Sequence, residues 1–130
     1  MKQMKILLAD DQALLRSALR LWLEQQPHIQ VVEEAAEASS LMAKIEAALP
    51  DILLLDWELP GLGITNGTRQ LLHALRNGFP QLRVVAFSSH PEARMSALNA
   101  GVDAFVSKTA PPDLLLDAFN LVSGQSKIGD

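Results

Sequence analysis

Five side chains that could carry phosphoryl chemistry stand where short apolar runs of the sequence end. They are Asp10, Asp11, Asp56, Ser88 and Lys108. Carboxylates held close together repel one another, which raises the pKa of at least one of them unless a cation lies between them. An all-oxygen site with few protein ligands and room for water suits Mg²⁺ or Mn²⁺. Because a lysine and a hydroxyl can bond the oxygens of a phosphoryl group, the set predicts that a carboxylate attacks such a group in line.

The run that leads to Asp56 is the clearest of these signals. Four apolar residues, 52–55, are bounded by prolines on both sides and predict a short strand buried on both faces, as in the middle of a parallel sheet. Ligands bind at the carboxyl ends of such strands, so Asp56 stands where chemistry is expected. Asp51 is no candidate, because the strand places it roughly 16 Å away, at the opposite edge of the sheet.

Strands and helices alternate five times along the sequence. Strands are predicted at 5–9, 29–33, 52–56, 82–87 and 104–107. Parallel strands need helical crossovers, which are right-handed almost without exception. The predicted fold class is therefore α/β, a flavodoxin-like, doubly wound sheet of five parallel strands in the order 2-1-3-4-5, with helices on both faces. In that order the first and third strands are neighbours, which brings Asp10, Asp11 and Asp56 into one pocket.

Three of the predicted helices show an apolar face at helical spacing. These faces are Leu14, Leu15, Ala18, Leu19 and Trp22 in the first helix, Leu41, Met42, Ile45 and Leu49 in the second, and Leu114, Leu115, Ala118, Phe119 and Val122 in the last. Ser39 or Ser40 is the predicted N-cap of the second helix. A short helix around 71–75 and another over 91–100 complete the set.

Length and composition narrow the class of protein. A chain of 130 residues fits one domain and can bury a sizeable core. It has no cysteine, which excludes disulfides and thiolate metal sites, and its net charge of −4 gives no electrostatic reason to expect nucleic-acid binding. No apolar run reaches the roughly 18 residues of a membrane span and no secretory signal is visible, so we expect a cytoplasmic protein without membrane contact.

The chain resembles the receiver domain of two-component response regulators, a CheY-like domain. The matching elements, in this order, are Asp10-Asp11, Asp56 within LLLDWELPG, Ser88, Phe105 and Lys108. The segments DDQALLRSALRLWLEQ and KTAPPDLLLDAF resemble the LuxR/NarL-type subgroup, whose receivers precede a helix-turn-helix output domain. The resemblance assigns 4–123 to a receiver domain and leaves 124–130 as the start of a linker or a disordered tail.

The resemblance implies that Asp56 is the phosphoacceptor of a signalling protein. Asp56 would form an aspartyl phosphate in a reaction that depends on Mg²⁺ or Mn²⁺. Asp11 would ligate the metal directly and Asp10 would assist through water. Asp56 itself and the main-chain carbonyl of Glu58 would complete the protein ligands.

The resemblance implies that the remaining matching residues respond to the phosphoryl group. Lys108 would pair with Asp56 and later with the phosphoryl oxygens. Ser88 would move to bond the phosphoryl group, and Phe105 would change rotamer in step, so that protein–protein contacts switch. The implied partners are a histidine kinase or phosphotransfer protein and a second copy in a homodimer, with DNA contacted only through an output domain absent from this chain. The chain would be no enzyme beyond its own phosphoryl transfer and dephosphorylation.

Two other functions stay open at this point. A haloacid-dehalogenase-like phosphatase also uses an aspartyl nucleophile, but that class expects a second aspartate two residues on, where this chain has Glu58. A receiver-like interaction module that never turns over phosphate is the other. The sequence also departs from common receivers in a longer loop at 61–67 and in a shorter segment at 88–108.

Overall fold

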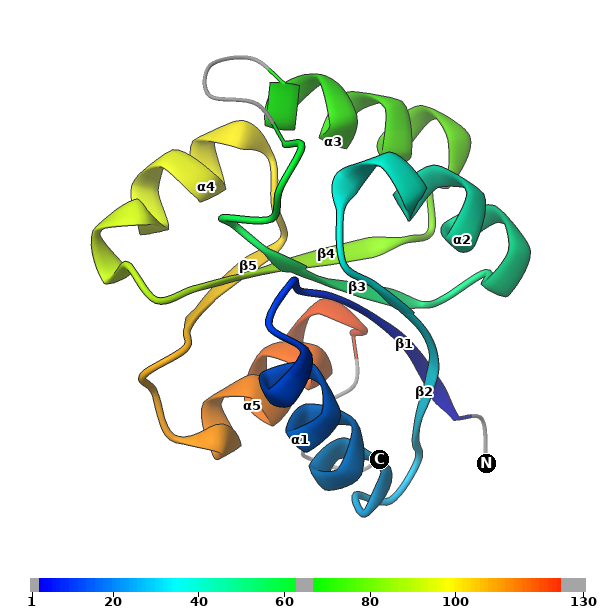
Figure 1. Cartoon of the computed structure of the whole chain (residues 1–130), viewed down its shortest axis with the longest axis vertical. Coiled ribbons are helices and arrows are strands. Elements are labelled where there is room, and N and C mark those ends of the chain that lie inside the picture. Colours follow the sequence, from blue (N-terminus) through cyan, green and yellow to red (C-terminus); the bar gives the residue numbers. More distant parts are fainter. Residues whose placement is uncertain (1–2, 63–66, 125–130) are drawn as a thin grey trace.

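The computed structural model describes residues 3–62 and 67–124, and a five-stranded sheet forms its centre (Figure 1). The strands are β1 (Met4–Ala9), β2 (Ile29–Ala35), β3 (Ile52–Asp56), β4 (Arg83–Ser88) and β5 (Ala104–Ser107). They lie in the order β2-β1-β3-β4-β5, and every neighbouring pair is parallel. The predicted fold class and strand order are confirmed.

Helices cover both faces of this sheet, as right-handed crossovers require. One face carries α1 (Ala13–Glu24) and α5 (Pro112–Val122), and the other carries α2 (Leu41–Ala48), α3 (Gly67–Gly78) and α4 (Arg94–Ala100) (Figure 1). Short 3₁₀ turns, η1 (Ala38–Ser40) and η2 (Pro91–Ala93), lead into α2 and α4. The helix predicted over 91–100 is thus split, and α4 itself has seven residues. Within 3–62 and 67–124, no helix has the length and apolar character to cross a bilayer.

The central strand β3 is buried at all five of its positions. Leu53 and Leu55 belong to the core under α2, α3 and α4, whereas Ile52 and Leu54 belong to the core under α1 and α5. Successive side chains of a strand point to opposite faces, so both cores hold the same strand in place. β3 therefore delivers Asp56 to a fixed position at its carboxyl end.

The predicted core faces of α1 and α5 are wrong at their edges. Leu14 is 89% exposed and Ala18 is also exposed, whereas Leu23, which the prediction omitted, is fully buried. In α5, Leu114 is exposed and its neighbour Leu115 is buried. Helical spacing identifies residues on a common side, but the roll of the helix against the sheet decides which stripe is covered.

The second helix also differs from its prediction. Ser40 stands at the N-cap of α2 without a side-chain capping bond, because η1 runs directly into the helix and gives Ser40 helical angles (φ −97°, ψ −6°) in place of extended ones. Leu41 and Ile45 are buried, but Met42 and Leu49 are exposed. The core face of this short helix therefore consists of two positions one turn apart.

Leu49 ends α2 in a left-handed conformation, with φ 49° and ψ 58°, and its side chain is 62% exposed. A residue with a Cβ atom pays about 1–2 kcal/mol in this region, and glycine loses part of that advantage through its greater freedom in the unfolded chain. We expect Leu49→Gly to raise the free energy of unfolding by about 0.5–1 kcal/mol in urea denaturation. Leu49→Ala is the matched control, because it removes the same contacts and keeps the Cβ atom. Equal stability of the glycine and alanine variants would contradict this explanation.

Candidate functional site

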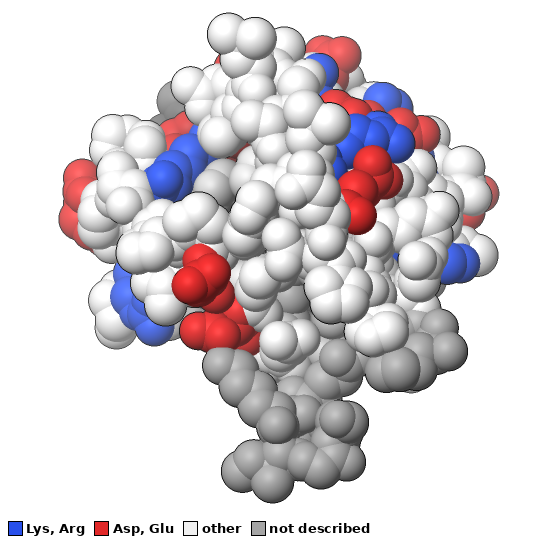
Figure 2. All heavy atoms as spheres, turned by 90° about the horizontal axis from the view of Figure 1, so that it is seen from below, with Lys and Arg blue, Asp and Glu red and all other residues white. Residues whose placement is uncertain are grey.

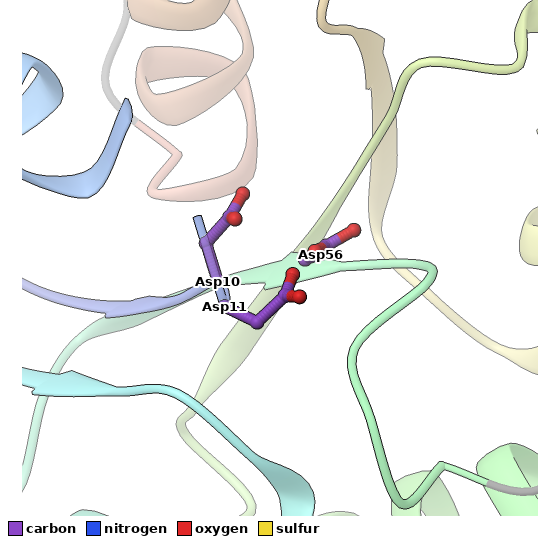
Figure 3. A group of neighbouring side chains, drawn as sticks. All are labelled: Asp10, Asp11 and Asp56. Atoms are coloured by element: carbon purple, nitrogen blue, oxygen red, sulfur yellow. The ribbon is translucent and has the colours of Figure 1, made fainter. Parts of the chain in front are cut away.

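The carboxylates of Asp10, Asp11 and Asp56 meet at the carboxyl ends of β1 and β3 (Figure 3). The two strands are parallel neighbours with Ala9 opposite Leu55, so the residues that follow reach the same edge of the sheet. One oxygen atom of each carboxylate lies within 4.8 Å of those of the other two. Asp10 and Asp56 are 3% and 2% exposed, whereas Asp11 is open to solvent. The sequence prediction that these three acids share one pocket is confirmed.

Lys108 follows β5 and brings its ammonium group into the same pocket. Its Nζ atom lies 2.8 Å from Asp10 Oδ2 and 3.4 Å from Asp56 Oδ1, and its side chain is only 12% exposed. The predicted pairing with Asp56 is therefore present, but the contact with Asp10 is the shorter one. Nζ also donates to Gln12 Oε1 at 3.2 Å, a contact that sequence reasoning missed.

The burial of Asp56 dominates the electrostatics of the pocket. Burial raises the pKa of Asp56 from its ordinary 3.8 to about 6, and the negative charge of Asp10 adds to this increase. The main-chain N–H of Glu58, 3.0 Å from Oδ1, and the ammonium of Lys108 act in the opposite direction. Burial also disfavours the charged form of Lys108, but its bonds and charge interactions with Asp10 and Asp56 outweigh this and raise its pKa.

The three carboxylates form a donor set that fits a hard divalent cation. Every side-chain donor is an oxygen atom, and the exposure of Asp11 leaves room for water in the coordination shell. Lys108 offsets only part of the negative charge, because one ammonium faces three carboxylates. The pocket is therefore compatible with Mg²⁺ or Mn²⁺ held by Asp10, Asp11 and Asp56. The main-chain carbonyl of Glu58 stays a predicted ligand.

Ser88, the last residue of β4, is fully buried beside this pocket. Its hydroxyl donates to Glu58 Oε2 at 2.8 Å and accepts the main-chain N–H of His90 at 3.0 Å. Sequence reasoning included Glu58 for its main-chain carbonyl and missed this side-chain contact. The signal that could have revealed it is topological, because Glu58 lies two residues beyond the end of β3 and β4 is the adjacent strand. In this conformation the hydroxyl of Ser88 donates its short hydrogen bond to the carboxylate of Glu58.

Phe105 lies in β5 opposite Ala86 and is 8% exposed. Its ring belongs to the core under α2, α3 and α4, which is the ordinary environment of an aromatic residue in a strand. It also lines the cleft between α4 and α5 together with Arg94 and Leu114. The switch role of Phe105 stays a prediction.

Two features predicted from the sequence fall partly outside the described residues. The longer loop at 61–67 is described at Gly61, Leu62 and Gly67, and 63–66 lie outside the described ranges. The predicted linker at 124–130 is described only at Gly124.

Comparison with known families decides the identity of the domain. The sequence model of the family described as "Response regulator receiver domain" matches residues 6–120. This chain is a receiver domain of the response-regulator family. Receiver domains are in general signalling modules without an enzymatic role of their own, and the family matched is that of receivers and not that of the haloacid-dehalogenase-like phosphatases. The pocket of Asp10, Asp11 and Asp56 has the composition and place of a receiver's phosphoacceptor site.

Relatives of this receiver belong to the LuxR/NarL type that the sequence predicted. It is 36% identical over 121 residues to the transcriptional activator protein ExaE of Pseudomonas putida, covering 92% of this chain and 55% of that protein. It is 35% identical over 117 residues to the nitrate/nitrite response regulator protein NarL of Escherichia coli strain K12, covering 88% and 52%. The receiver thus spans about half the length of the curated relatives it matches.

Solved structures show the same fold. A two-component response regulator of the LuxR family from Aurantimonas aligns with a TM-score of 0.81 at 29% identity, over 95% of this chain and 88% of that chain. The signal receiver domain of a response regulator NarL from Mycobacterium tuberculosis aligns with a TM-score of 0.77 at 27% identity, over 92% and 98%.

Proposed function

We propose that this receiver accepts a phosphoryl group on Asp56 from a histidine kinase or phosphotransfer protein, in the presence of Mg²⁺ or Mn²⁺. The observation that carries the proposal is the buried carboxylate of Asp56, which lies within reach of two further carboxylates and 3.4 Å from the ammonium of Lys108. Asp10 also faces Lys108, at 2.8 Å, so the choice of Asp56 as the acceptor rests in addition on its place at the end of the central strand β3. The receiver acts on no substrate other than its own phosphate.

The chain's own residues supply the parts that phosphoryl transfer requires. A carboxylate oxygen of Asp56 attacks phosphorus, the O–P bond forms as the P–N bond of the donor phosphohistidine breaks, and the departing imidazole takes a proton from solvent. Asp10, Asp11 and Asp56 would hold the divalent cation, which would offset charge on the phosphoryl oxygens. Lys108 would exchange its carboxylate partners for a phosphoryl oxygen.

The phosphorylated receiver would differ from the unphosphorylated one at Ser88. The hydroxyl of Ser88 now donates to Glu58, and a phosphoryl group on Asp56 offers it a more highly charged acceptor. Exchange of that bond would move the start of the segment that leads to α4. Phe105 would adjust its rotamer in step and alter the surface formed by α4, β5 and α5.

The partners of the whole protein follow from the same proposal. The receiver, 4–123, would control a helix-turn-helix output domain that lies beyond this chain, and DNA would be bound only by that domain. A homodimer of phosphorylated receivers and a cytoplasmic location belong to this proposal.

Incubation with Mg²⁺ and a small phosphodonor such as phosphoramidate tests the proposal by intact-protein mass spectrometry. We expect one phosphoryl group per chain in the wild type, and none in Asp56→Asn or in the presence of a chelator. Asp51→Asn is the matched control, because Asp51 precedes β3 at its other end, where its carboxylate accepts the Lys5 N–H at 2.9 Å. This variant should accept phosphate as the wild type does. An unmodified wild type would favour the phosphate-independent interaction module.

A further inference from the structure

The turn after β1 is fixed at Asp10 by four separate contacts. The main-chain N–H of Asp10 donates to Ala35 O at 2.9 Å, and its carbonyl accepts Arg16 Nη1 at 2.7 Å. Its Oδ1 atom accepts the main-chain N–H of Gln12 at 2.8 Å, and its Oδ2 atom lies 2.8 Å from Lys108 Nζ. Three of these contacts come from β2, from the turn itself and from the pocket, and Arg16 supplies the fourth from α1.

The guanidinium of Arg16 connects this turn to the edge strand β2. While Nη1 holds the carbonyl of Asp10, Nε donates to Glu34 Oε1 at 2.8 Å. Glu34 lies in β2 opposite Leu8 of β1, so its own position is set by the sheet. The side chain of Arg16 is 19% exposed, and a planar guanidinium with two bonds in different directions has little freedom to rotate.

Glu34 remains an anchor whether or not Arg16 is present. Arg20 Nη1 bonds the second carboxylate oxygen of Glu34 at 2.5 Å, and Arg20 Nη2 donates to Val31 O at 3.3 Å. Burial raises the pKa of Glu34, but its bonds to the two arginines outweigh burial and hold the pKa below its ordinary value. Figure 2, which views the side of the molecule that carries α1 and α5, shows basic side chains directly against acidic ones on an otherwise largely uncharged face.

We infer that Arg16 is a positioning residue for the cation site, an inference that rests on the proposed function. A peptide unit is planar, so a fixed carbonyl at Asp10 also fixes the N–H and the Cα atom of Asp11. Asp11 is the exposed carboxylate of the pocket, so the direction of this carboxylate depends on the position of the main chain at Asp11. Arg16 holds that main chain, and Glu34 holds Arg16. Residues that orient metal ligands in this way contribute to affinity without touching the metal.

Binding of Mn²⁺ to the full chain, followed by the electron paramagnetic resonance of the free ion, tests this role. We expect Arg16→Gln to weaken Mn²⁺ binding about tenfold. Arg20→Gln is the matched control, because Arg20 shares the anchor Glu34 and, within the described residues, does not bond Asp10. Its Mn²⁺ affinity should stay that of the wild type. Arg16→Lys keeps the positive charge but loses the planar guanidinium that bonds two partners at once. Its Mn²⁺ affinity should lie between those of the wild type and Arg16→Gln.

Amide hydrogen exchange without metal gives a second readout that does not depend on cation binding. The N–H of Gln12 should lose protection in Arg16→Gln and keep it in Arg20→Gln. Unchanged Mn²⁺ affinity in Arg16→Gln, or an equal loss in both glutamine variants, would overturn the inference. A wild type that binds no Mn²⁺ would overturn the proposed cation site instead, and the exchange of Gln12 would show separately whether Arg16 holds the turn.

Discussion

Replacing Asp56 by asparagine should stabilise the cation-free receiver by about 2–3 kcal/mol in neutral or mildly alkaline solution, although it removes the phosphoacceptor. The carboxylate is buried, and its pKa is raised to about 6 in the folded state, first by burial and then by the charge of Asp10. A tenfold change in acid dissociation corresponds to about 1.4 kcal/mol, which gives the size of the expected gain. An asparagine can accept the N–H of Glu58 without placing a charge in the pocket.

The sign of the pH dependence follows from which state binds the proton of Asp56 more tightly. The folded state does, so between about pH 4 and about pH 6 the wild type loses stability as pH rises, and above this window the loss is complete. The stabilisation by Asp56→Asn should therefore be near zero at the acid end and full at the alkaline end. Urea denaturation in the presence of a chelator measures it. Asp11→Asn, at the exposed carboxylate, is the control and should give a clearly smaller gain. An Asp56→Asn variant less stable than the wild type in alkaline solution would contradict the conclusion that the buried charge of Asp56 destabilises the folded receiver.

Lys108→Met should destabilise the cation-free receiver by about 3 kcal/mol, because the substitution leaves a buried carboxylate without its counter-charge. Asp10 Oδ2 makes its short contact with Lys108 Nζ, and the side chain of Asp10 is 4% exposed. Methionine preserves most of the apolar stem, so the loss reports chiefly on the ammonium. The substitution also removes the cation–π contact between Lys108 Nζ and the ring of Phe87, whose centroid lies 5.6 Å from Nζ.

Addition of Mg²⁺ should reverse much of this loss. A cation in the pocket would replace the missing ammonium, so the rise in thermal midpoint on adding Mg²⁺ should be larger in Lys108→Met than in the wild type. Lys44→Met is the matched control, because the ammonium of Lys44 lies 3.9 Å from Glu33 and donates to the main-chain carbonyl of Glu34, both in β2, and makes no ion pair with the three pocket carboxylates within the described residues. It should lose less than about 1 kcal/mol and show the wild-type response to Mg²⁺. A Lys108→Met variant with wild-type stability and an unchanged Mg²⁺ response would show that the pocket does not depend on this charge pair.

The sequence was sufficient to predict which residues the fold brings together in the site. Apolar runs bounded by prolines and glycines define the strands, and the right-handed crossover leaves few ways to order them. Asp10, Asp56, Ser88 and Lys108 each stand at the carboxyl end of a strand or just after it, so the topology alone brings them to one edge. Their predicted proximity depended on no side-chain detail, and this is why it is confirmed.

The contacts that depend on helix roll and rotamers could not be predicted. The periodicity of α1 included Leu14 and omitted Leu23, because the spacing of apolar residues does not say how the helix turns against the sheet. The bond between Ser88 and the side chain of Glu58 depends on rotamers, and so does the fork of Arg16 between Asp10 and Glu34. A sequence pattern predicts which strand ends are neighbours, whereas the hydrogen-bond partners of each oxygen atom depend on the three-dimensional structure.

The position of the phosphoryl group within the chain decides whether this pocket is a phosphoacceptor site. After incubation with Mg²⁺ and phosphoramidate, borohydride reduces an aspartyl phosphate to homoserine, and peptide mass spectrometry locates that residue. We expect homoserine at position 56 alone. Homoserine at position 10 or 11, or at no position in a folded and cation-loaded receiver, would contradict the assignment of Asp56.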